Sequence, residues 1–477
     1  MKLLEKLQQQ WSKASLVRRF LLGVSAVAVA LLVASAALIT TELVAHNDIL
    51  TLTSDSKFLN ASSQSISNPA NDAQIQRGAY LAKLGNCAAC HTARGGAAFA
   101  GGLAIHTPFG AVYTSNITPD AATGIGRWSA DAFYRAMHEG RSANGSLLTP
   151  AFPYANYTLV TRQDSDALHA FFMQGVAPVA QPNKPHELHF PFNTQVALAA
   201  WRLLFFNAAA STENPKYAAN NDHTTVTLAE NSINIERGAY LVKGLGHCSA
   251  CHAQRNALGA TEREQTLSGA LMPMQDWYAP SLLLAAEAGV AHWPREQVVA
   301  LLKTGVSASA SVAGPMAEVV AKSTQYWSDA DLQSAALYLQ SLPQVAAPKQ
   351  KSMQIAGQPT SAQFLRGQAL FGQHCASCHG EAGQGLRVEG NVALPALAGN
   401  RAVQMPNTTN LVRIILAGGY APSTAGNPRP FGMPPFVHVL PDEDLAAVVT
   451  YIRGAWGNGA DSISAVEVIA QRKGLMR

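Results

Sequence analysis

Cys87-Ala88-Ala89-Cys90-His91 is the first of three Cys-x-x-Cys-His motifs in this chain; the others are Cys248-Ser249-Ala250-Cys251-His252 and Cys375-Ala376-Ser377-Cys378-His379. This motif is the attachment signature of c-type haem: two thiols bind the porphyrin as thioethers, and the histidine becomes an axial iron ligand. The chain has 6 cysteines, and the motifs use all of them. The sequence therefore predicts three haem c groups, bound by Cys87, Cys90, Cys248, Cys251, Cys375 and Cys378, with His91, His252 and His379 on the irons.

Other uses of paired cysteines fit this pattern poorly. A structural zinc site needs a second pair of Cys or His near the first. A thioredoxin-like redox pair needs no histidine after it, and a disulfide framework would not repeat one spacing three times. Because no cysteine lies outside the motifs, no thiol is left for a disulfide or for catalysis.

The length and composition are those of a multidomain globular protein. A chain of 477 residues is expected to form about three domains, which agrees with three motifs. With 48% hydrophobic and 13% charged residues, it is neither a disordered chain nor a polytopic membrane protein. The net charge of +4 is small for this length, and no Lys/Arg cluster is interleaved with aromatic residues, so we expect no nucleic-acid partner.

An uncharged run near the N-terminus predicts a membrane anchor. Residues 20–41 carry no charge and are long enough for a helix to cross the roughly 30 Å hydrocarbon layer. Basic residues dominate before the run and Glu42 follows it, which places the N-terminus in the cytoplasm. We expect residues 1–45 to be a cytoplasmic N-terminus and single-pass anchor in the bacterial inner (cytoplasmic) membrane, with the haem domains facing the periplasm. The alternative is a signal peptide cleaved after Ala34-Ser35-Ala36.

Each motif is preceded and followed by similar helical patterns. The first motif is preceded by Arg77-Gly78-Ala79-Tyr80-Leu81, the second by the identical stretch 237–241 and the third by the related stretch 366–371, on what should be short amphipathic helices. Residues 164–174, 329–341 and 442–453 open with acidic residues, where the helix dipole favours them, and continue with apolar residues at helical spacing. We expect each closing helix to pack on the first helix and clamp the haem.

These patterns predict a mainly α fold with three tandem class I cytochrome c-like domains behind one N-terminal transmembrane helix. The segment expected to link the first two domains contains an apolar run, residues 196–206. This run is too short to span a bilayer and could be core, interface or membrane-surface contact. The expected segments after the anchor are domain 1 at 72–176, a linker with an apolar helix at 177–229, domain 2 at 230–343, domain 3 at 361–460 and a C-terminal tail at 461–477.

Methionines in two proline-rich loops are candidates for the second axial ligand. A haem c iron with histidine on one side commonly takes methionine on the other, which raises its potential. Met433 lies in Arg429-Pro-Phe-Gly-Met-Pro-Pro435, where prolines stiffen the loop, and Met316 follows Gly314-Pro315. In the first domain the comparable position holds Phe152, which cannot bind iron. That iron is then five-coordinate, or takes a substitute ligand from a partner subunit or from Met137, His138 or Met173.

Several further stretches resemble one family. From Gln74 to Trp456 the chain resembles the three-haem cytochrome c subunits of membrane-bound bacterial alcohol, gluconate, sorbitol or aldehyde dehydrogenases. The stretches that carry the resemblance are Gly101-Gly102-Leu103, Thr107-Pro108-Phe109-Gly110, 114–120, 123–126, Pro191-Phe192-Asn193, 201–206, Pro434 and Phe436, 451–453 and 456–458.

This resemblance implies a role in electron transfer. Such subunits accept electrons from a separate periplasmic catalytic subunit of the quinoprotein, flavoprotein or molybdenum type, and pass them to ubiquinone, a terminal oxidase or a soluble acceptor. The family's axial methionines map onto Met316 and Met433, and the family has methionine where this chain has Phe152. The chain shows no dinucleotide-binding GxGxxG unit of its own.

Two other functions are consistent with the same motifs. An open first haem could support peroxidase-like chemistry, with His106 or His138 as the distal acid–base group. The chain could also be a free-standing multihaem carrier without a catalytic partner. In the leading interpretation it has no substrate chemistry of its own.

Overall fold

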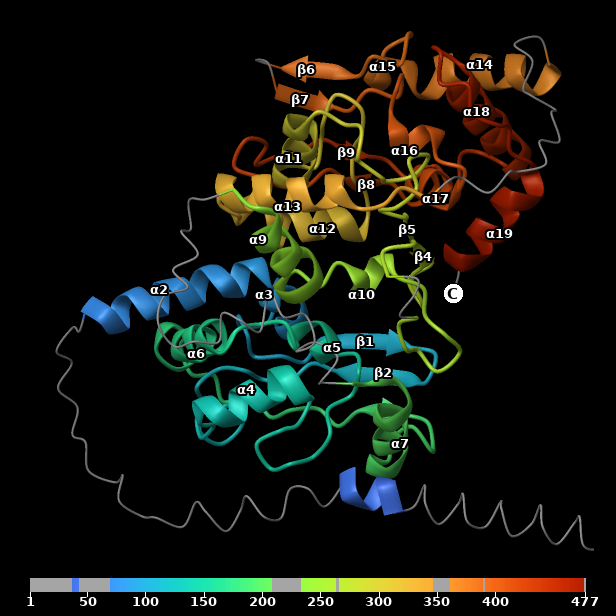
Figure 1. Cartoon of the computed structure of the whole chain (residues 1–477). Helices are drawn as coiled ribbons and strands as arrows, with labels where there is room; N and C mark the ends of the chain where they lie inside the picture. The colour runs from blue at the N-terminus through green and yellow to red at the C-terminus, as the bar shows by residue number, and fades with distance from the viewer. Residues whose placement is uncertain are drawn as a thin grey trace, which may run out of the picture.

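Helices dominate the computed structural model of this chain, as the sequence predicted (Figure 1). In the described part of the chain the strands are short and pair into small antiparallel sheets, one of three strands and three of two. The structure describes residues 37–42, 69–207, 233–262, 266–345, 361–388 and 391–475.

Residues 69–207, which we call unit 1, contain the first haem motif. The segment predicted as a linker, 177–229, contributes the third strand of its sheet, in which Leu188 pairs with Gly110. The elements are α2 (Pro69–Leu84), α3 (Cys87–His91), β1 (Ala104–Thr107), β2 (Gly110–Tyr113), α4 (Ala130–Glu139), α5 (Tyr154–Tyr157), α6 (Arg162–Ala170), the π-helical turn η2 (Phe171–Gly175), β3 (Glu187–Leu188) and α7 (Gln195–Phe205).

Residues 233–345 form unit 2, which contains the second motif. Its first helix starts at α9 and continues directly into the π-helical turn η4. The elements are α9 (Ile235–Ala239), η4 (Tyr240–Leu245), α10 (Ser249–His252), β4 (Ala270–Leu271), β5 (Tyr278–Ala279), α11 (Arg295–Thr304), α12 (Pro315–Lys322), the 3-10 turn η6 (Thr324–Tyr326) and α13 (Asp329–Ser341).

Residues 361–475 form unit 3, which contains the third motif. The segment that the sequence analysis set apart as a tail contains α19, and Ile463 and Val468 lie in the core of the unit. The elements are α14 (Ala362–His374), α15 (Ala376–His379), β6 (Leu386–Val388), β7 (Asn391–Leu394), α16 (Arg401–Gln404), α17 (Thr409–Ala417), β8 (Gly419–Tyr420), β9 (Gly432–Met433), α18 (Asp442–Gly454) and α19 (Ala465–Leu475).

In each unit, the helix before the motif crosses the closing helix at a glycine. A Cβ added to Gly78 would lie 1.9 Å from the carbonyl oxygen of Ala167. The same contact would be 2.0 Å between Gly238 and Ser334. In unit 3 it would be 2.0 Å between Gly367 and Ala447. Only glycine allows the two backbones to approach this closely, which explains why the Arg-Gly pair recurs before every motif.

The arginine before each crossing glycine pairs with an aspartate in the first turn of the closing helix. Arg77 Nη2 lies 2.5 Å from Asp164 Oδ1, and Arg237 Nε lies 2.7 Å from Asp331 Oδ1. Arg366 pairs with Asp444 in the same way. All three aspartates occupy the third position of their helix, where a negative charge is favoured by the dipole.

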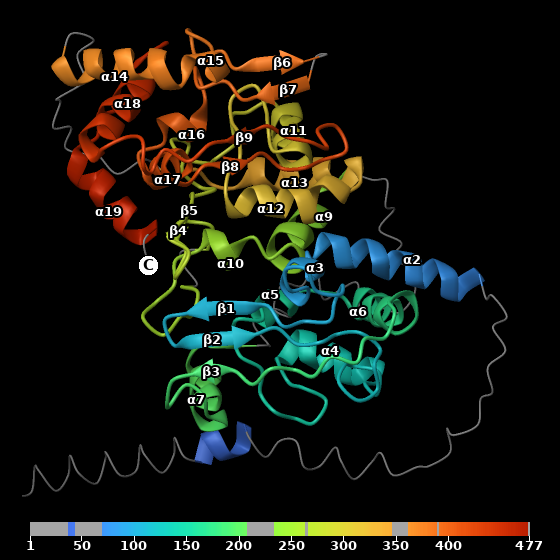
Figure 2. The same ribbon diagram turned by 180° about the vertical axis from the view of Figure 1, so that it is seen from behind.

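Units 1 and 2 share one hydrophobic core, whereas unit 3 has its own. Leu81 and Leu84 of unit 1 belong to the same buried cluster as Leu241 and Leu245 of unit 2. The cluster of unit 3 is built from that unit alone, around α14 and α18. Opposite views show unit 2 between unit 1 and unit 3 (Figures 1 and 2).

The contact between units 2 and 3 is mainly polar. Asn410 accepts a hydrogen bond from the backbone N–H of Tyr278 at 2.9 Å and donates one to the Tyr278 carbonyl at 2.7 Å. The N–H of Arg401 donates to the carbonyl of Ser309 at 2.7 Å. Because hydrogen bonds of amide groups have strict geometry, they fix the orientation of unit 3 on unit 2 without a shared apolar core.

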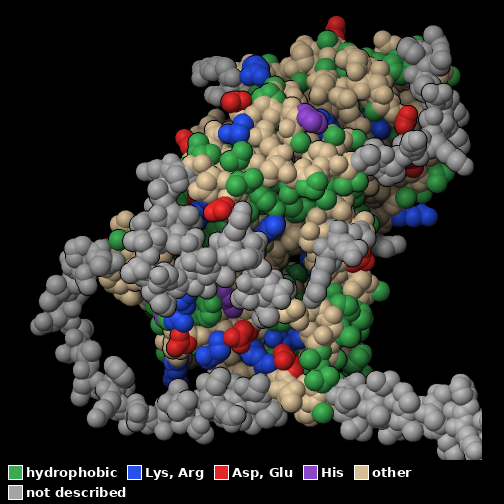
Figure 3. Space-filling model, viewed as in Figure 1, with side chains coloured by type: hydrophobic (Ala, Val, Ile, Leu, Met, Phe, Trp, Pro, Cys, Tyr) green, Lys and Arg blue, Asp and Glu red, His purple; other side chains and the backbone are tan. Residues whose placement is uncertain are grey.

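The apolar run at 196–206 forms α7 with its apolar side facing outward. Arg202 is buried, whereas Val196, Leu203 and Leu204 are 55%, 44% and 68% exposed. Hydrophobic side chains accordingly reach the surface over α7 (Figure 3). The sequence left core, interface and membrane-surface contact open for this run. Core is therefore wrong for the side of α7 that faces outward.

The predicted anchor lies outside the described residues except for 37–42, which form a short helix. Glu42 ties this helix to unit 1, because its Oε1 lies 2.8 Å from Arg202 Nε and 2.9 Å from Arg141 Nη2. Among the residues that the structure describes, no helix has the length and apolar character needed to cross a membrane.

Candidate functional site

The motif cysteines lie in or at the start of the short helices α3, α10 and α15, where Cys248 and Cys375 are the N-cap residues of α10 and α15, and none of the six is in a disulfide. The first cysteine of each pair packs against the core of its own unit. Burial raises the pKa of Cys87 and Cys248 to about 12, and that of Cys375 to about 11. The thiols are therefore neutral, unlike the low-pKa thiolates of catalytic cysteines, and are positioned for covalent attachment of a buried apolar group.

In units 1 and 2, the motif histidine is oriented by a backbone carbonyl. His91 Nδ1 lies 2.7 Å from the Ser115 carbonyl oxygen, and His252 Nδ1 lies 2.7 Å from that of Pro280. Nδ1–H donates in these bonds, which leaves Nε2 unprotonated and free to bind a metal. In unit 3, burial lowers the pKa of His379 and the Pro395 carbonyl opposes this, although Nδ1 makes no hydrogen bond of normal geometry. These features fit an axial ligand in each unit.

A glycine in a left-handed conformation closes the loop after each motif. The N–H of Gly101 donates to the His91 carbonyl at 2.8 Å, and that of Gly269 to the His252 carbonyl at 2.8 Å. In unit 3, the N–H of Gly385 donates to the His379 carbonyl at 2.9 Å. The three glycines have φ values of 72°, 83° and 69°, and a Cβ on any of them would meet backbone atoms within 2.5 Å.

These glycines hold the histidine loop against the segment that supplies the carbonyl. A Cβ on Gly101 would touch Ser115 itself, and a Cβ on Gly269 would lie 3.0 Å from the carbonyl carbon of Pro280. From the sequence, Gly101 stands out only within a stretch that carries the family resemblance, and Gly269 and Gly385 do not stand out at all. The number of residues between the motif histidine and this glycine differs from unit to unit, so no common sequence spacing identifies these glycines.

The two methionines predicted as axial ligands lie in different settings. Met433, in β9, is partly buried against the same core as Cys375 and Ala376 of the third motif. Met316 is the second residue of α12 and is also partly buried. Their assignment as iron ligands stays a prediction.

Phe152 lies beside the first motif. It packs against the same core as Cys87, and its ring centroid is 5.3 Å from that of Tyr157. Burial, followed by the nearby Cys87 and Cys90, raises the pKa of Tyr157 well above its usual value. Tyr157 therefore lies near the first attachment helix, and Phe152 packs against it.

The possible substitute ligands in unit 1 are held elsewhere or are partly exposed. Met137 is buried in the core, and Met173 is half-buried in η2. His138 Nε2 lies 2.5 Å from the Val160 carbonyl, and its ring stacks on Tyr134. His106 is exposed on β1. Because its Nε2 is already engaged, His138 is a structural residue in this arrangement.

Comparisons with known proteins agree with this site. The family model described as cytochrome c matches residues 364–456, within unit 3. The cytochrome c subunit of a quinone alcohol dehydrogenase from Gluconacetobacter polyoxogenes is 38% identical over 418 residues, covering 84% of this chain and 85% of that protein. The gluconate 2-dehydrogenase cytochrome c subunit of Pantoea cypripedii is 38% identical over 421 residues, covering 85% and 90%.

A third relative is the fructose dehydrogenase cytochrome subunit of Gluconobacter japonicus, which is 35% identical over 422 residues and covers 84% of this chain and 83% of that protein. These three relatives each cover most of this chain and are 35–38% identical to it. The family resemblance found in the sequence is thereby confirmed. This chain belongs to the family of cytochrome c subunits of alcohol, gluconate and fructose dehydrogenases.

Proposed function

We propose that this chain is a membrane-anchored electron-transfer subunit with three haem c groups. It accepts electrons from a periplasmic catalytic subunit that oxidises an alcohol, an aldehyde or a sugar acid, and it passes them to ubiquinone or a terminal oxidase. The observation that supports this most is a repeated arrangement: a cysteine pair and a glycine-closed loop in all three units, with the motif histidine bound to a backbone carbonyl in units 1 and 2.

Haem supplies reversible one-electron exchange when it is bound. Cys87, Cys248 and Cys375 would hold its edge on the core side, with the second cysteine of each pair completing the attachment. His91, His252 and His379 would supply Nε2 to iron, with Met316 and Met433 as the opposite ligands in units 2 and 3. The closing helices α6, α13 and α18 would exclude water from the porphyrin face.

The same arrangement in all three units supports the tandem reading of the fold. Units 1 and 2 repeat the glycine crossing and the Arg–Asp pair of unit 3, which is the part that matches the cytochrome c family model. We therefore assign each unit as a cytochrome c-like domain that binds one haem.

Membrane attachment is supported by the surroundings of Glu42. The uncharged run ends one residue before Glu42, which is bound to Arg202 on the buried side of α7. The exposed apolar side of α7 and the exposed Leu38 lie in this same region. Apolar side chains gathered where an anchor would leave the bilayer fit a surface that rests on lipid.

Purification of the full chain from native membranes tests the function. We expect haem staining on a denaturing gel, three haems per chain by mass, and a dehydrogenase subunit in stoichiometric yield whose substrate reduces the haems. A protein with fewer than three covalent haems would refute the proposal. Recovery of the chain alone, still able to reduce an acceptor, would favour the free-standing carrier.

The proposed membrane attachment is tested separately, by washing the membranes at alkaline pH and by measuring the intact mass of the chain. Retention of residues 1–36 and resistance to the wash would support an anchor. Loss of the segment that ends at Ala36 would support the cleaved signal peptide instead.

Peroxidase-like chemistry is a second candidate because Phe152 occupies the position of the expected ligand. Its acid–base group lacks support, since His138 is bound to Val160 and His106 is exposed. Strong carbon monoxide binding at one haem together with peroxide turnover would favour this function, and carbon monoxide binding without turnover would exclude it.

A further inference from the structure

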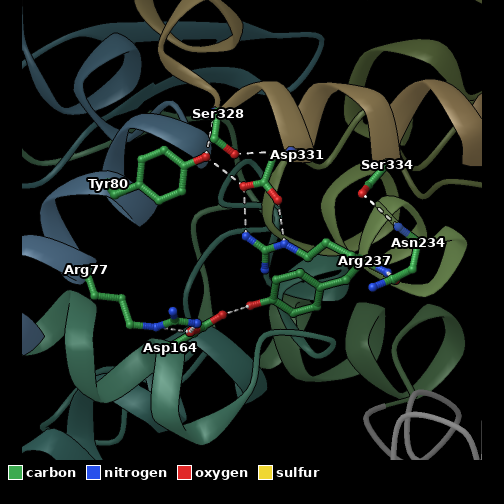
Figure 4. A network of polar contacts seen from close by, with 9 residues as sticks. Arg77, Tyr80, Asp164, Asn234, Arg237, Ser328, Asp331 and Ser334 are labelled. Atoms are coloured by element: carbon green, nitrogen blue, oxygen red, sulfur yellow. Dashed lines mark hydrogen bonds and ion pairs between the residues drawn. The ribbon is translucent and has the colours of Figure 1, made fainter. Parts of the chain in front are cut away.

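Two tyrosines form hydrogen bonds that cross between units 1 and 2. The hydroxyl of Tyr80 donates to Asp331 Oδ2 at 2.7 Å, and that of Tyr240 donates to Asp164 Oδ2 at 2.5 Å (Figure 4). Each tyrosine lies three residues after the arginine of its own repeat. Each aspartate therefore binds the arginine of its own unit and the tyrosine of the other unit.

The two carboxylates need these partners because they are buried. Asp164 and Asp331 are 2% and 3% exposed. Arg237 forms two bonds to Asp331, from Nε to Oδ1 at 2.7 Å and from Nη2 to Oδ2 at 2.9 Å. A buried carboxylate is tolerated when its charge is paired and its remaining oxygen accepts further hydrogen bonds. Tyr240 binds the oxygen of Asp164 that Arg77 does not bind. Tyr80 adds a second donor to Asp331 Oδ2, which also accepts from Arg237.

The tyrosines are held as donors. Burial, followed by the bond to Asp331, raises the pKa of Tyr80 to about 12. Burial and Asp164 raise the pKa of Tyr240 well above its usual value. Tyr80 also accepts a bond from the backbone N–H of Ser328 at 2.8 Å, which fixes it at the start of α13. Both hydroxyls therefore remain protonated, and able to donate, at neutral pH.

The same interface brings the first and second attachment motifs together. Asn156 of α5 donates to Ser249 Oγ, inside the second motif, at 2.8 Å. In the reverse direction, α12 of unit 2 contacts α3 of unit 1, and Ser323 donates to the Leu84 carbonyl at 3.0 Å.

Unit 3 has no tyrosine at the position from which Tyr80 and Tyr240 bind the aspartate of the other unit. Ala369 stands three residues after Arg366, where units 1 and 2 have tyrosine. Unit 3 instead contacts unit 2 through polar bonds such as those of Asn410 with Tyr278. The tyrosine thus occurs only in the two units whose attachment motifs lie side by side.

We propose that Tyr80 and Tyr240 are positioning residues that fix the gap between the haems of units 1 and 2, so that these units act as one rigid two-haem module. Unit 2 is then the middle of a linear relay, joined to unit 1 through the crossed tyrosines and to unit 3 through Asn410. The inference rests on the proposed function, since it requires haem at both motifs. Electron exchange between two centres falls steeply with their separation, which is why a fixed gap matters.

The test uses the full haem-loaded chain with Tyr80→Phe, Tyr240→Phe and both together. Haem content is measured first. The iron–iron dipolar coupling is then measured by pulsed electron paramagnetic resonance, and electron exchange between the haems of units 1 and 2 is measured after rapid photoreduction. Tyr113→Phe is the matched control, because this hydroxyl donates to Glu187 within its own unit.

We expect the double variant to broaden the iron–iron distance distribution of one pair and to slow exchange several-fold, while every haem potential stays the same. The single variants should show smaller changes in the same direction, and they carry the test if the double variant does not fold. An unchanged distribution and rate in a three-haem protein would overturn the positioning role alone. Fewer than three haems in the unmodified chain would refute the proposed function instead.

Discussion

Nδ1 of His252 lies 2.7 Å from the carbonyl oxygen of Pro280, the same distance that joins His91 to Ser115 in unit 1. The carbonyl acts as a fixed acceptor that selects the tautomer with a free Nε2. Because burial lowers the pKa of both rings, the neutral form that can bind iron is favoured further. The peptide segment that carries the acceptor is therefore as much a part of the site as the motif.

His252→Ala should remove one low-spin haem signal and stop substrate-dependent quinone reduction. Unit 2 lies between units 1 and 3, so loss of its axial ligand interrupts the relay rather than shortening it. The measurement is the optical and electron paramagnetic resonance spectrum, followed by quinone reduction in membranes. His292→Ala is the control, because His292 is exposed in the same unit. Unchanged quinone reduction by the His252 variant would contradict a relay through unit 2.

Phe152→Met should convert the first haem into a His/Met centre. Phe152 packs on Tyr157, which lies near Cys87 and Cys90, so a thioether at this place would lie on the same side of unit 1 as the first attachment motif. We expect a higher potential for this haem and weaker carbon monoxide binding, because methionine ligation raises the potential and fills the open position. The comparison variant is Phe190→Met, since Phe190 is 82% exposed in the same unit. A spectrum and potential that stay fixed would place Phe152 away from the distal side.

The haem motifs and the paired helices could be predicted because their signals are local. The Arg-Gly pair and the acidic helix starts recur in all three units, and in each unit they form one crossing. The crossed tyrosines could not be predicted in this way. Tyr80 and Asp331 are 251 positions apart, and an identical Arg-Gly-Ala-Tyr-Leu stretch in both units does not say which unit's aspartate each tyrosine meets.

Two other features were hidden for different physical reasons. Gly269 and Gly385, like Gly101, donate a backbone hydrogen bond to the carbonyl of the motif histidine. The loops between histidine and glycine differ in length, so only the folded backbone shows that the three glycines are equivalent. For α7, helical spacing of apolar residues predicts an amphipathic helix without saying which side is buried. The buried side is set by Arg202, which reaches Glu42 from far along the chain.

Gly367→Ala should destabilise unit 3, whereas Gly372→Ala on the same helix should stabilise it. The added Cβ of the first variant would lie 2.0 Å from the Ala447 carbonyl oxygen, so α14 and α18 must move apart. Such overpacking costs about 1–3 kcal/mol. Gly372 is exposed with nothing near its Cβ position, so alanine there should gain about 0.5–1 kcal/mol through the lower entropy of the unfolded chain. Scanning calorimetry of the haem-loaded chain measures both. Equal shifts for the two variants would show that the close crossing is not what requires glycine.

The stability of unit 1 should fall in mild acid because of His138. Burial lowers the pKa of His138 from 6.5 to about 4, and the Val160 carbonyl opposes this only partly. The folded state therefore favours the neutral ring, while the unfolded chain takes up a proton near the ordinary value. This contribution to stability is complete above pH 6.5 and is lost as the pH falls from 6.5 toward 4.

His138→Gln removes the titrating ring but keeps a polar side chain that can donate to Val160. We expect the variant to have a flatter profile of unfolding midpoint against pH across this window, whereas the unmodified chain loses stability steadily. His106→Gln is the matched control, because His106 is exposed on β1 in the same unit. Parallel profiles for the His138 variant and the unmodified chain would mean that the ring is protonated equally in the folded and unfolded states, and the structural role assigned to it in unit 1 would then fail.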